Sequence, residues 1–231
     1  MSELWDIVPG DWGPTRAVAA TRRELYVIDD DTHLYRVDPI TGAYEDSIER
    51  GWESEHMVAL GEHLFIWEPS GTLYRVNPIS ATYEELDGSW RDVRAVTALG
   101  DRLYAIDGRE LYSIDPRTGD YEQLDNSWDV RHLIGHGAHL FEWDDDNALY
   151  RVDPRTGSAT QLEHNWPLTA GVASACGRLY ASDNGILYRV DPAMGECEEI
   201  TDRLHTRMLI GVGSSIYSFD TTGILYRIGV G

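Results

Sequence analysis

Residues 34–42 read Leu-Tyr-Arg-Val-Asp-Pro-Ile-Thr-Gly, and the rest of the chain is built on near copies of this stretch. Close copies begin at Leu73, Leu111, Leu149 and Leu187, and a partial copy begins at Leu225. The first two copies start 39 residues apart, and the later ones start 38 apart. A fixed period of this length indicates a repeat architecture such as a solenoid or a propeller.

One period, residues 90–127, contains four short segments rich in Val, Ile, Leu and Tyr, separated by Gly, Pro, Asn or Asp. None of the four is long enough for a typical helix, so each is predicted to be a strand. The Asp-Pro-x-Thr-Gly segment predicts a tight turn, because Pro fixes φ, Asp can accept a backbone amide and Gly can adopt positive φ. Four antiparallel strands repeated radially are typical of a β-propeller. We therefore predict an all-β fold of four-stranded antiparallel blades.

The two ends of the chain predict six blades. The last repeat, from Leu204 to Gly231, contains three strand candidates, and residues 3–9 supply a fourth. Val8 precedes Trp12 by the spacing with which Leu86 precedes Trp90. An N-terminal strand that completes the last blade closes the ring and leaves no bare edge strand. The alternative is a five-bladed ring with a free N-terminal tail.

The predicted ring is a single β-propeller domain over residues 1–231. The blades are expected at about residues 12–49, 52–87, 90–125, 128–163, 166–201, and 204–231 together with 3–9.

The chain is strongly acidic, with 40 Asp and Glu against 19 basic residues and a formal net charge of −21. All the basic residues are Arg, which fits either adaptation to high salt or a GC-rich genome. Such a surface repels polyanions, so we expect neither nucleic acid nor an anionic membrane as a partner. No run approaches the roughly 20 apolar residues of a membrane span.

The N-terminal residues and the cysteines indicate the cellular compartment of the protein. Residues 1–3 form neither a basic nor an apolar signal region, so we expect no secretory signal, and leaderless export stays open. Cys176 and Cys197 fall on the first turn and the fourth strand of one repeat, and we expect them to be unpaired. Unpaired thiols fit a reducing compartment, so we predict a cytoplasmic protein. We also expect the protein to be a monomer.

Three sets of residues recur on the ring face opposite the Asp-Pro turns. The loop that enters each blade carries Trp12, Trp52, Trp90, Trp128 and Trp166. The second strands end on Asp29, Glu68, Asp107, Asp144, Asp183 and Asp220. The inner strands start near Arg16, Arg94, Arg131 and Arg207.

These three sets allow two interpretations. An indole face beside a carboxylate and a guanidinium suits a sugar, and repetition of the site would give avidity. Alternatively, Trp covers the seam between blades, the acid caps its own turn and Arg neutralises the acid. Two further rings of aromatic positions, one that includes Tyr26 and one that includes Tyr35, are expected to be core.

Catalytic and metal sites are not expected. His132 and His136 can share a strand face, but they are about 13 Å apart along a strand, too far for one tetrahedral ion. There is no nucleophile elbow, and no Ser, His and Asp set stands out from the repeat. We therefore predict no cofactor, no metal and no catalytic residue.

The unit Trp…Gly…Leu-Tyr-Ala-Ile-Asp…Leu-Tyr-Arg-Val-Asp-Pro resembles the short-repeat bacterial β-propellers and, more loosely, the tectonin-type propeller lectins. The resemblance spans nearly the whole chain. Tectonin repeats usually have a second strand like Trp-Gly-Val-Asn, which is Leu-Tyr-Ala-Ile-Asp here, and no binding residue carries over. The resemblance implies a bacterial propeller. Together with the Trp, Arg and acid sets, it predicts a non-enzymatic, carbohydrate-binding module, with a protein–protein interaction scaffold as the alternative.

Overall fold

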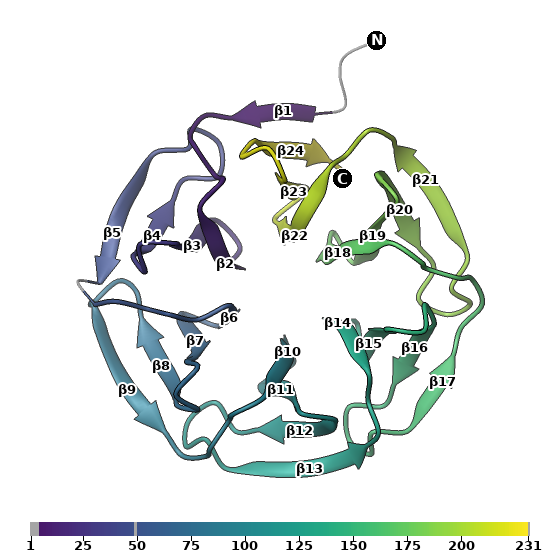
Figure 1. Ribbon diagram of the computed structural model, residues 1–231, viewed down its shortest axis with the longest axis horizontal. Coiled ribbons are helices and arrows are strands. Elements are labelled where there is room, and N and C mark those ends of the chain that lie inside the picture. Colours follow the sequence, from purple (N-terminus) through teal and green to yellow (C-terminus); the bar gives the residue numbers. More distant parts are fainter. Residues whose placement is uncertain (1–4, 49, 231) are drawn as a thin grey trace.

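The chain forms six four-stranded antiparallel sheets arranged as a ring in a computed structural model that describes residues 5–48 and 50–230 (Figure 1). The predicted six-bladed β-propeller is therefore confirmed. No helix occurs in the described residues, and so none there is long and apolar enough to cross a bilayer.

The first three blades follow the chain from Thr15 to Asn126. Blade 1 comprises β2 (Thr15–Ala20), β3 (Leu25–Asp29), β4 (Leu34–Val37) and β5 (Tyr44–Ile48). Blade 2 comprises β6 (His56–Leu60), β7 (His63–Trp67), β8 (Leu73–Asn77) and β9 (Thr82–Leu86). Blade 3 comprises β10 (Val93–Leu99), β11 (Arg102–Asp107), β12 (Glu110–Ile114) and β13 (Tyr121–Asn126).

The other three blades continue to Gly229. Blade 4 comprises β14 (Val130–His136), β15 (His139–Asp144), β16 (Leu149–Val152) and β17 (Ala159–Gln161). Blade 5 comprises β18 (Thr169–Ala175), β19 (Arg178–Asp183), β20 (Ile186–Val190) and β21 (Cys197–Thr201). Blade 6 comprises β22 (Thr206–Val212), β23 (Ser215–Asp220), β24 (Leu225–Gly229) and β1 (Trp5–Val8). The first strand of each blade lies nearest the ring axis, and the fourth lies on the rim (Figure 1).

Strand β1 closes the ring, as the spacing predicts. It pairs antiparallel with β24, with Trp5 opposite Ile228 and Val8 opposite Leu225. The fourth strand of blade 2 has the same register, since Leu86 lies opposite Leu73. Val8 is only 2% exposed, which shows that the closing strand contributes to the core. Residues 3 and 4 of the predicted strand, and Gly231, lie outside the described residues.

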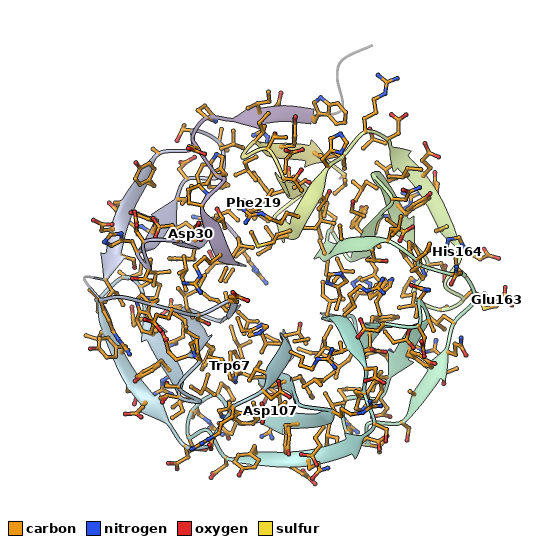
Figure 2. All side chains as sticks on the ribbon, viewed as in Figure 1. Asp30, Trp67, Asp107, Glu163, His164 and Phe219 are labelled. Atoms are coloured by element: carbon orange, nitrogen blue, oxygen red, sulfur yellow. The ribbon has the colours of Figure 1, made fainter. Side chains whose placement is uncertain are left out.

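The hydrophobic core is divided into six clusters, one at each seam between neighbouring blades. At the seam between blades 1 and 2, for example, Trp52 packs with Ile28 of blade 1 and Leu64 of blade 2. Figure 2 shows side chains crowding these seams, with Trp67 and Phe219 among them. Tyr26 is buried and Tyr35 is half-buried at the seams, in agreement with their predicted core role. Each blade therefore depends on both neighbours for burial, which makes ring closure important for stability.

Glycines allow some inner strands to approach one another closely. A Cβ on Gly211 of β22 would lie 2.2 Å from the carbonyl oxygen of Ser174 on β18. A Cβ on Gly135 of β14 would lie 2.4 Å from the carbonyl oxygen of Ala98 on β10. Both contacts are with backbone atoms, which cannot move away as a flexible side chain could. The spacing of these inner strands therefore requires glycine.

We expect Gly211→Ala to lower the free energy of unfolding by about 1–3 kcal/mol, the usual cost of overpacking a close contact. Chemical denaturation of the variant measures this loss. Gly229→Ala is the matched control, because Gly229 is also in a strand of blade 6 and has no atom within 4 Å of the added Cβ. Equal stabilities of the two variants would contradict the close approach of β18 and β22.

Candidate functional site

The six predicted acids bind backbone amides at the ends of the second strands. Three carboxylates cap their own turn: Asp29 accepts from the amide of His33, Asp144 from that of Ala148 and Asp220 from that of Thr222. The other three accept from the loop that enters the same blade: Glu68 from Glu53, Asp107 from Asp92 and Asp183 from Leu168. The turn-capping interpretation therefore agrees with the contacts of Asp29, Asp144 and Asp220, whereas the other three acids bind the entering loop instead.

The five predicted Trp side chains are packing residues. Their exposed fractions are between 0 and 8%, with Trp52 and Trp166 at 0% and Trp128 at 8%. This low exposure favours the interpretation in which Trp covers the seam between blades. Each indole belongs to the hydrophobic cluster of a seam between two blades, where a large aromatic side chain buries much apolar surface.

The four predicted arginines join each blade to the next. Arg207 of blade 6 donates to the carbonyl oxygens of Thr15 and Trp12, at 2.6 and 3.2 Å. Arg131 of blade 4 donates to the carbonyls of Trp166 and Pro167, both at 3.4 Å. The other two form ion pairs across seams, Arg16 with Glu55 at 3.7 Å and Arg94 with Asp129 at 3.8 Å. These guanidiniums hold the ring together on this face.

One cavity brings all three predicted kinds of residue together. Arg16, Glu68 and Trp90 line a cavity of about 240 Å³ between blades 2 and 3. Burial raises the pKa of the Glu68 carboxyl above its ordinary value, and its buried Oε1 has no hydrogen-bond partner. Burial lowers the pKa of His56, which lines the same cavity. The cavity thus offers a carboxyl that can accept or donate a hydrogen bond, beside a guanidinium.

A larger cavity opens on the opposite face of the ring. It measures about 990 Å³ and is lined by Arg22, Arg23, Glu24 and Glu62 from the first hairpins of blades 1 and 2 and by Ile79 from a turn of blade 2. It contains none of the predicted site residues. Its open shape and mixed charges give no sign of a particular ligand.

Sequence reasoning missed a set of aromatic groups that Trp forms with Tyr on the third and fourth strands of the same blade. In blade 2, Trp52 lies 5.6 Å from both Tyr74 and Tyr83. In blade 3, Trp90 lies 5.4 Å from Tyr112 and 5.2 Å from Tyr121. The repeat contains a signal for these groups, because a third-strand tyrosine follows each of the five Trp by 22 or 23 residues, and blades 1 to 3 add a fourth-strand tyrosine. From the sequence alone, however, a periodic tyrosine cannot be distinguished from a core residue.

The thiols are free, as predicted. Cys176 is exposed and Cys197 is half-buried, with its Sγ 3.5 Å from His164 Nε2. Among residues 5–48 and 50–230, no group of three or more His, Cys, Asp or Glu side chains has a geometry that could hold a metal ion.

Comparison with known proteins finds chains of similar fold but no match by sequence. No protein-family model matches the chain, and no curated protein sequence matches it. A Bacteroides thetaiotaomicron protein of unknown function matches with a TM-score of 0.74 and 12% identity, over 97% of this chain and 72% of that one. Virginiamycin B lyase from Staphylococcus aureus matches with a TM-score of 0.67 and 8% identity, over 97% and 98%. A chain of a nidogen/laminin complex matches with a TM-score of 0.67 and 15% identity, over 86% and 84%.

These similarities place the chain in the structural class of β-propellers. At identities of 8 to 15%, they show the fold alone. One of the three similar chains is a lyase and another belongs to a protein complex, so the fold does not decide between catalysis and binding.

Proposed function

We propose that this protein is a non-enzymatic interaction scaffold that binds a cationic polypeptide. The observation that carries the proposal is the net charge of −21, combined with the internal use of the arginines. Ten arginines of the described residues lie within 4.0 Å of a carboxylate oxygen: Arg16, Arg36, Arg75, Arg94, Arg109, Arg117, Arg131, Arg189, Arg203 and Arg227. With these positive charges paired within the chain, the excess carboxylates give the outer surface a negative potential that attracts basic partners.

Two further observations support a binding role. The side chain with the largest pKa shift among the carboxyls, Glu142, is sealed in a seam and lines none of the cavities described above, so it is not placed to act on a substrate. A structurally similar chain comes from a nidogen/laminin complex, so this fold occurs in a protein–protein assembly. The low exposure of the Trp rings favours a protein ligand over stacking of a sugar on all five indoles. Sugar binding in the cavity of Arg16, Glu68 and Trp90 remains the competing function.

Selection of a random peptide library displayed on phage against the immobilised protein tests the proposal. We expect enrichment of peptides rich in Arg and Lys, because the surface potential favours their approach. Binding of a synthetic enriched peptide should weaken at least tenfold between about 0.05 and about 0.5 M NaCl, as the Debye length shortens.

A glycan array probed with the same protein is the control. Signals on the array, together with no enrichment of basic peptides, would replace the scaffold by a lectin. A peptide of the same composition with Glu in place of each basic residue should not bind.

A further inference from the structure

Blade 2 shows how this repeat binds a guanidinium. The Arg50 Cζ lies over three aromatic rings, 4.2 Å from the centroid of Tyr74, 4.4 Å from Trp52 and 4.8 Å from Tyr83. Arg50 Nη1 is buried and has no hydrogen-bond partner. The π faces of the three rings therefore attract this cation, together with the charge of the Glu68 carboxyl. Arg50 stands two residues before the Trp of its blade.

Blade 1 has the same three aromatic residues around a cavity. Trp12, Tyr35 and Tyr44 occupy the repeat positions of Trp52, Tyr74 and Tyr83, and they line a cavity of about 160 Å³ that we call the blade 1 box. The Tyr35 and Tyr44 rings meet edge to face at 5.2 Å, and Tyr44 is 66% exposed. The box therefore has one wall that a ligand can reach from solvent.

Blade 1 has no side chain at the repeat position from which Arg50 fills the aromatic group of blade 2. Gly10 stands two residues before Trp12, where blade 2 has Arg50. Its φ is +136°, and a Cβ at this position would lie 2.8 Å from the Trp12 indole. Any side chain here is both strained and in collision with the ring. The blade 1 box is thus left without an internal cation.

The charges around the blade 1 box suit a cation. The carboxylates of Asp11 and Asp29 are among the lining groups. Within the described residues, the only ion-pair partner of Asp29 is the His33 imidazole, at 4.0 Å. Burial and the negative charges of Asp29 and Asp46 raise the pKa of the Tyr35 hydroxyl, in agreement with a negative potential inside the box.

We propose that the blade 1 box binds the guanidinium of an arginine side chain from a partner polypeptide. This inference rests on the proposed function and names its anchoring site. The ligand would lie where Arg50 lies in blade 2, over Trp12, Tyr35 and Tyr44, with Asp29 supplying the opposite charge. A cationic side chain in an aromatic site of this kind gains about 0.5–1 kcal/mol at an exposed site and about 2 kcal/mol when it is desolvated, which is a two- to thirtyfold gain in affinity.

In the part of the chain that the structure describes, blades 3 and 5 have no open box at these positions, and blade 5 has Cys197 in place of the fourth-strand tyrosine. Blade 3 also has a glycine, Gly88, two residues before its Trp, but the Tyr112 and Tyr121 rings both lie within 5.4 Å of Trp90, and the Tyr112 hydroxyl donates to Glu110. In blade 5 the ring of His164, at the repeat position of Arg50, lies 4.7 Å from Trp166. Figure 2 shows His164 on the rim of the ring. We therefore assign the site for an external cation to blade 1.

Titration with Nα-acetyl-arginine amide, followed by the indole N–H signals in a ¹H–¹⁵N NMR spectrum, tests the proposal. We expect a saturable shift of the Trp12 signal, assigned with Trp12→Phe, and a Kd on the order of 1 mM. Nα-acetyl-citrulline amide has the same shape without the charge and should give no saturable shift. Equal binding of the citrulline derivative would overturn the proposal, because charge would then not be recognised.

Three variants locate the site. Tyr44→Leu should weaken binding of the arginine derivative about two- to fivefold, as expected for the loss of one ring. Tyr121→Leu, at the equivalent position of blade 3 and 54% exposed, is the matched control and should leave the Kd unchanged. Arg50→Ala should create a second site, seen as an additional shift of the Trp52 signal. Weakening by Tyr121→Leu and not by Tyr44→Leu would move the site to blade 3 and overturn the assignment.

The basic peptides from the phage selection separate this inference from the proposed function. Tight binding of such a peptide that Tyr44→Leu does not weaken would reject the blade 1 box and leave the scaffold in place. A Trp12 shift with the arginine derivative, without any binding of basic peptides, would keep the box and reject the scaffold.

Discussion

A protein that lacks residues 1–8 should lose about 4 kcal/mol of stability and should self-associate, because the deletion removes the strand that closes the ring. Val8 is buried in the core between blades 6 and 1, and Trp5 packs against Tyr226 with ring centroids 5.7 Å apart. Burial of these two side chains accounts for most of the expected loss. Ile7 is 62% exposed and adds little, and the exposed ion pair of Asp6 with Arg227 is not counted.

The loss is large against the whole stability of a domain, which is about 5–15 kcal/mol. It also exposes the hydrogen-bonding edge of β24, which can then pair with another molecule. Thermal denaturation measures the first effect, and size-exclusion chromatography with light scattering measures the second.

Complementation provides the control for this deletion. A synthetic peptide of residues 1–9, added to the truncated protein, should restore the melting temperature, whereas the same peptide with Val8→Asp should not. A truncated protein that has the wild-type melting temperature and elution volume would show that β1 contributes nothing to closure.

Glu142→Gln should make the protein more stable than the wild type by about 3 kcal/mol at pH 7, with little difference near pH 5. Glu142 is 1% exposed and its Oε1 has no hydrogen-bond partner. It shares a face of β15 with Leu140, toward the seam between blades 3 and 4. Burial, and then the negative charges of Asp144, Asp145 and Asp129, raise the pKa of Glu142 from 4.5 to about 9.

The sign of the pH dependence follows from this raised pKa. Between pH 4.5 and about 9 the folded state keeps the proton of Glu142 and the unfolded state loses it. Wild-type stability therefore falls by about 1.4 kcal/mol for each pH unit in this range, and the penalty is absent below pH 4.5. Gln keeps the shape of the side chain and removes the ionisation, so the difference between the two proteins isolates this one group.

Urea denaturation of both proteins at pH 5, 6, 7 and 8 measures the effect. Glu122→Gln, on an exposed part of β13, is the matched control and should leave the dependence of stability on pH unchanged. A constant difference between wild type and Glu142→Gln across this range would mean that Glu142 carries the same charge in the folded and unfolded states.

The position of Glu142 is itself a departure from the repeat. Its equivalents in the other blades are Val27, Ile66, Ala105, Ala181 and Ser218, which face the same side of their second strands. The substitution is visible in the sequence. Its burial is not, because a glutamate on a strand is usually found on a solvated face.

The candidate site was only partly predictable. Repeat spacing placed Trp, Arg and acid on one face, and in the cavity between blades 2 and 3 Arg16, Glu68 and Trp90 do meet. Spacing gives no exposed fraction, so it could not tell that the indoles are buried. It offered the second-strand acids as partners for the arginines, which instead bond to carbonyls and to other carboxylates of the following blade.

The sequence by itself determined the number of blades, the strands in each and the way in which the ring closes. These properties follow from local signals, since turn residues and alternating strands recur with a fixed period and the last repeat lacks the one strand that the N-terminus supplies. Only the tertiary structure decided which aromatic side chains are accessible. Trp12 and Trp90 occupy the same place in the repeat and both follow a glycine by two residues, but Trp12 lines a cavity with its two tyrosines, whereas Trp90 packs directly on its own two. Such a difference depends on side-chain packing across a seam, which brings together residues from separate strands. The residue pattern of one repeat does not predict this packing.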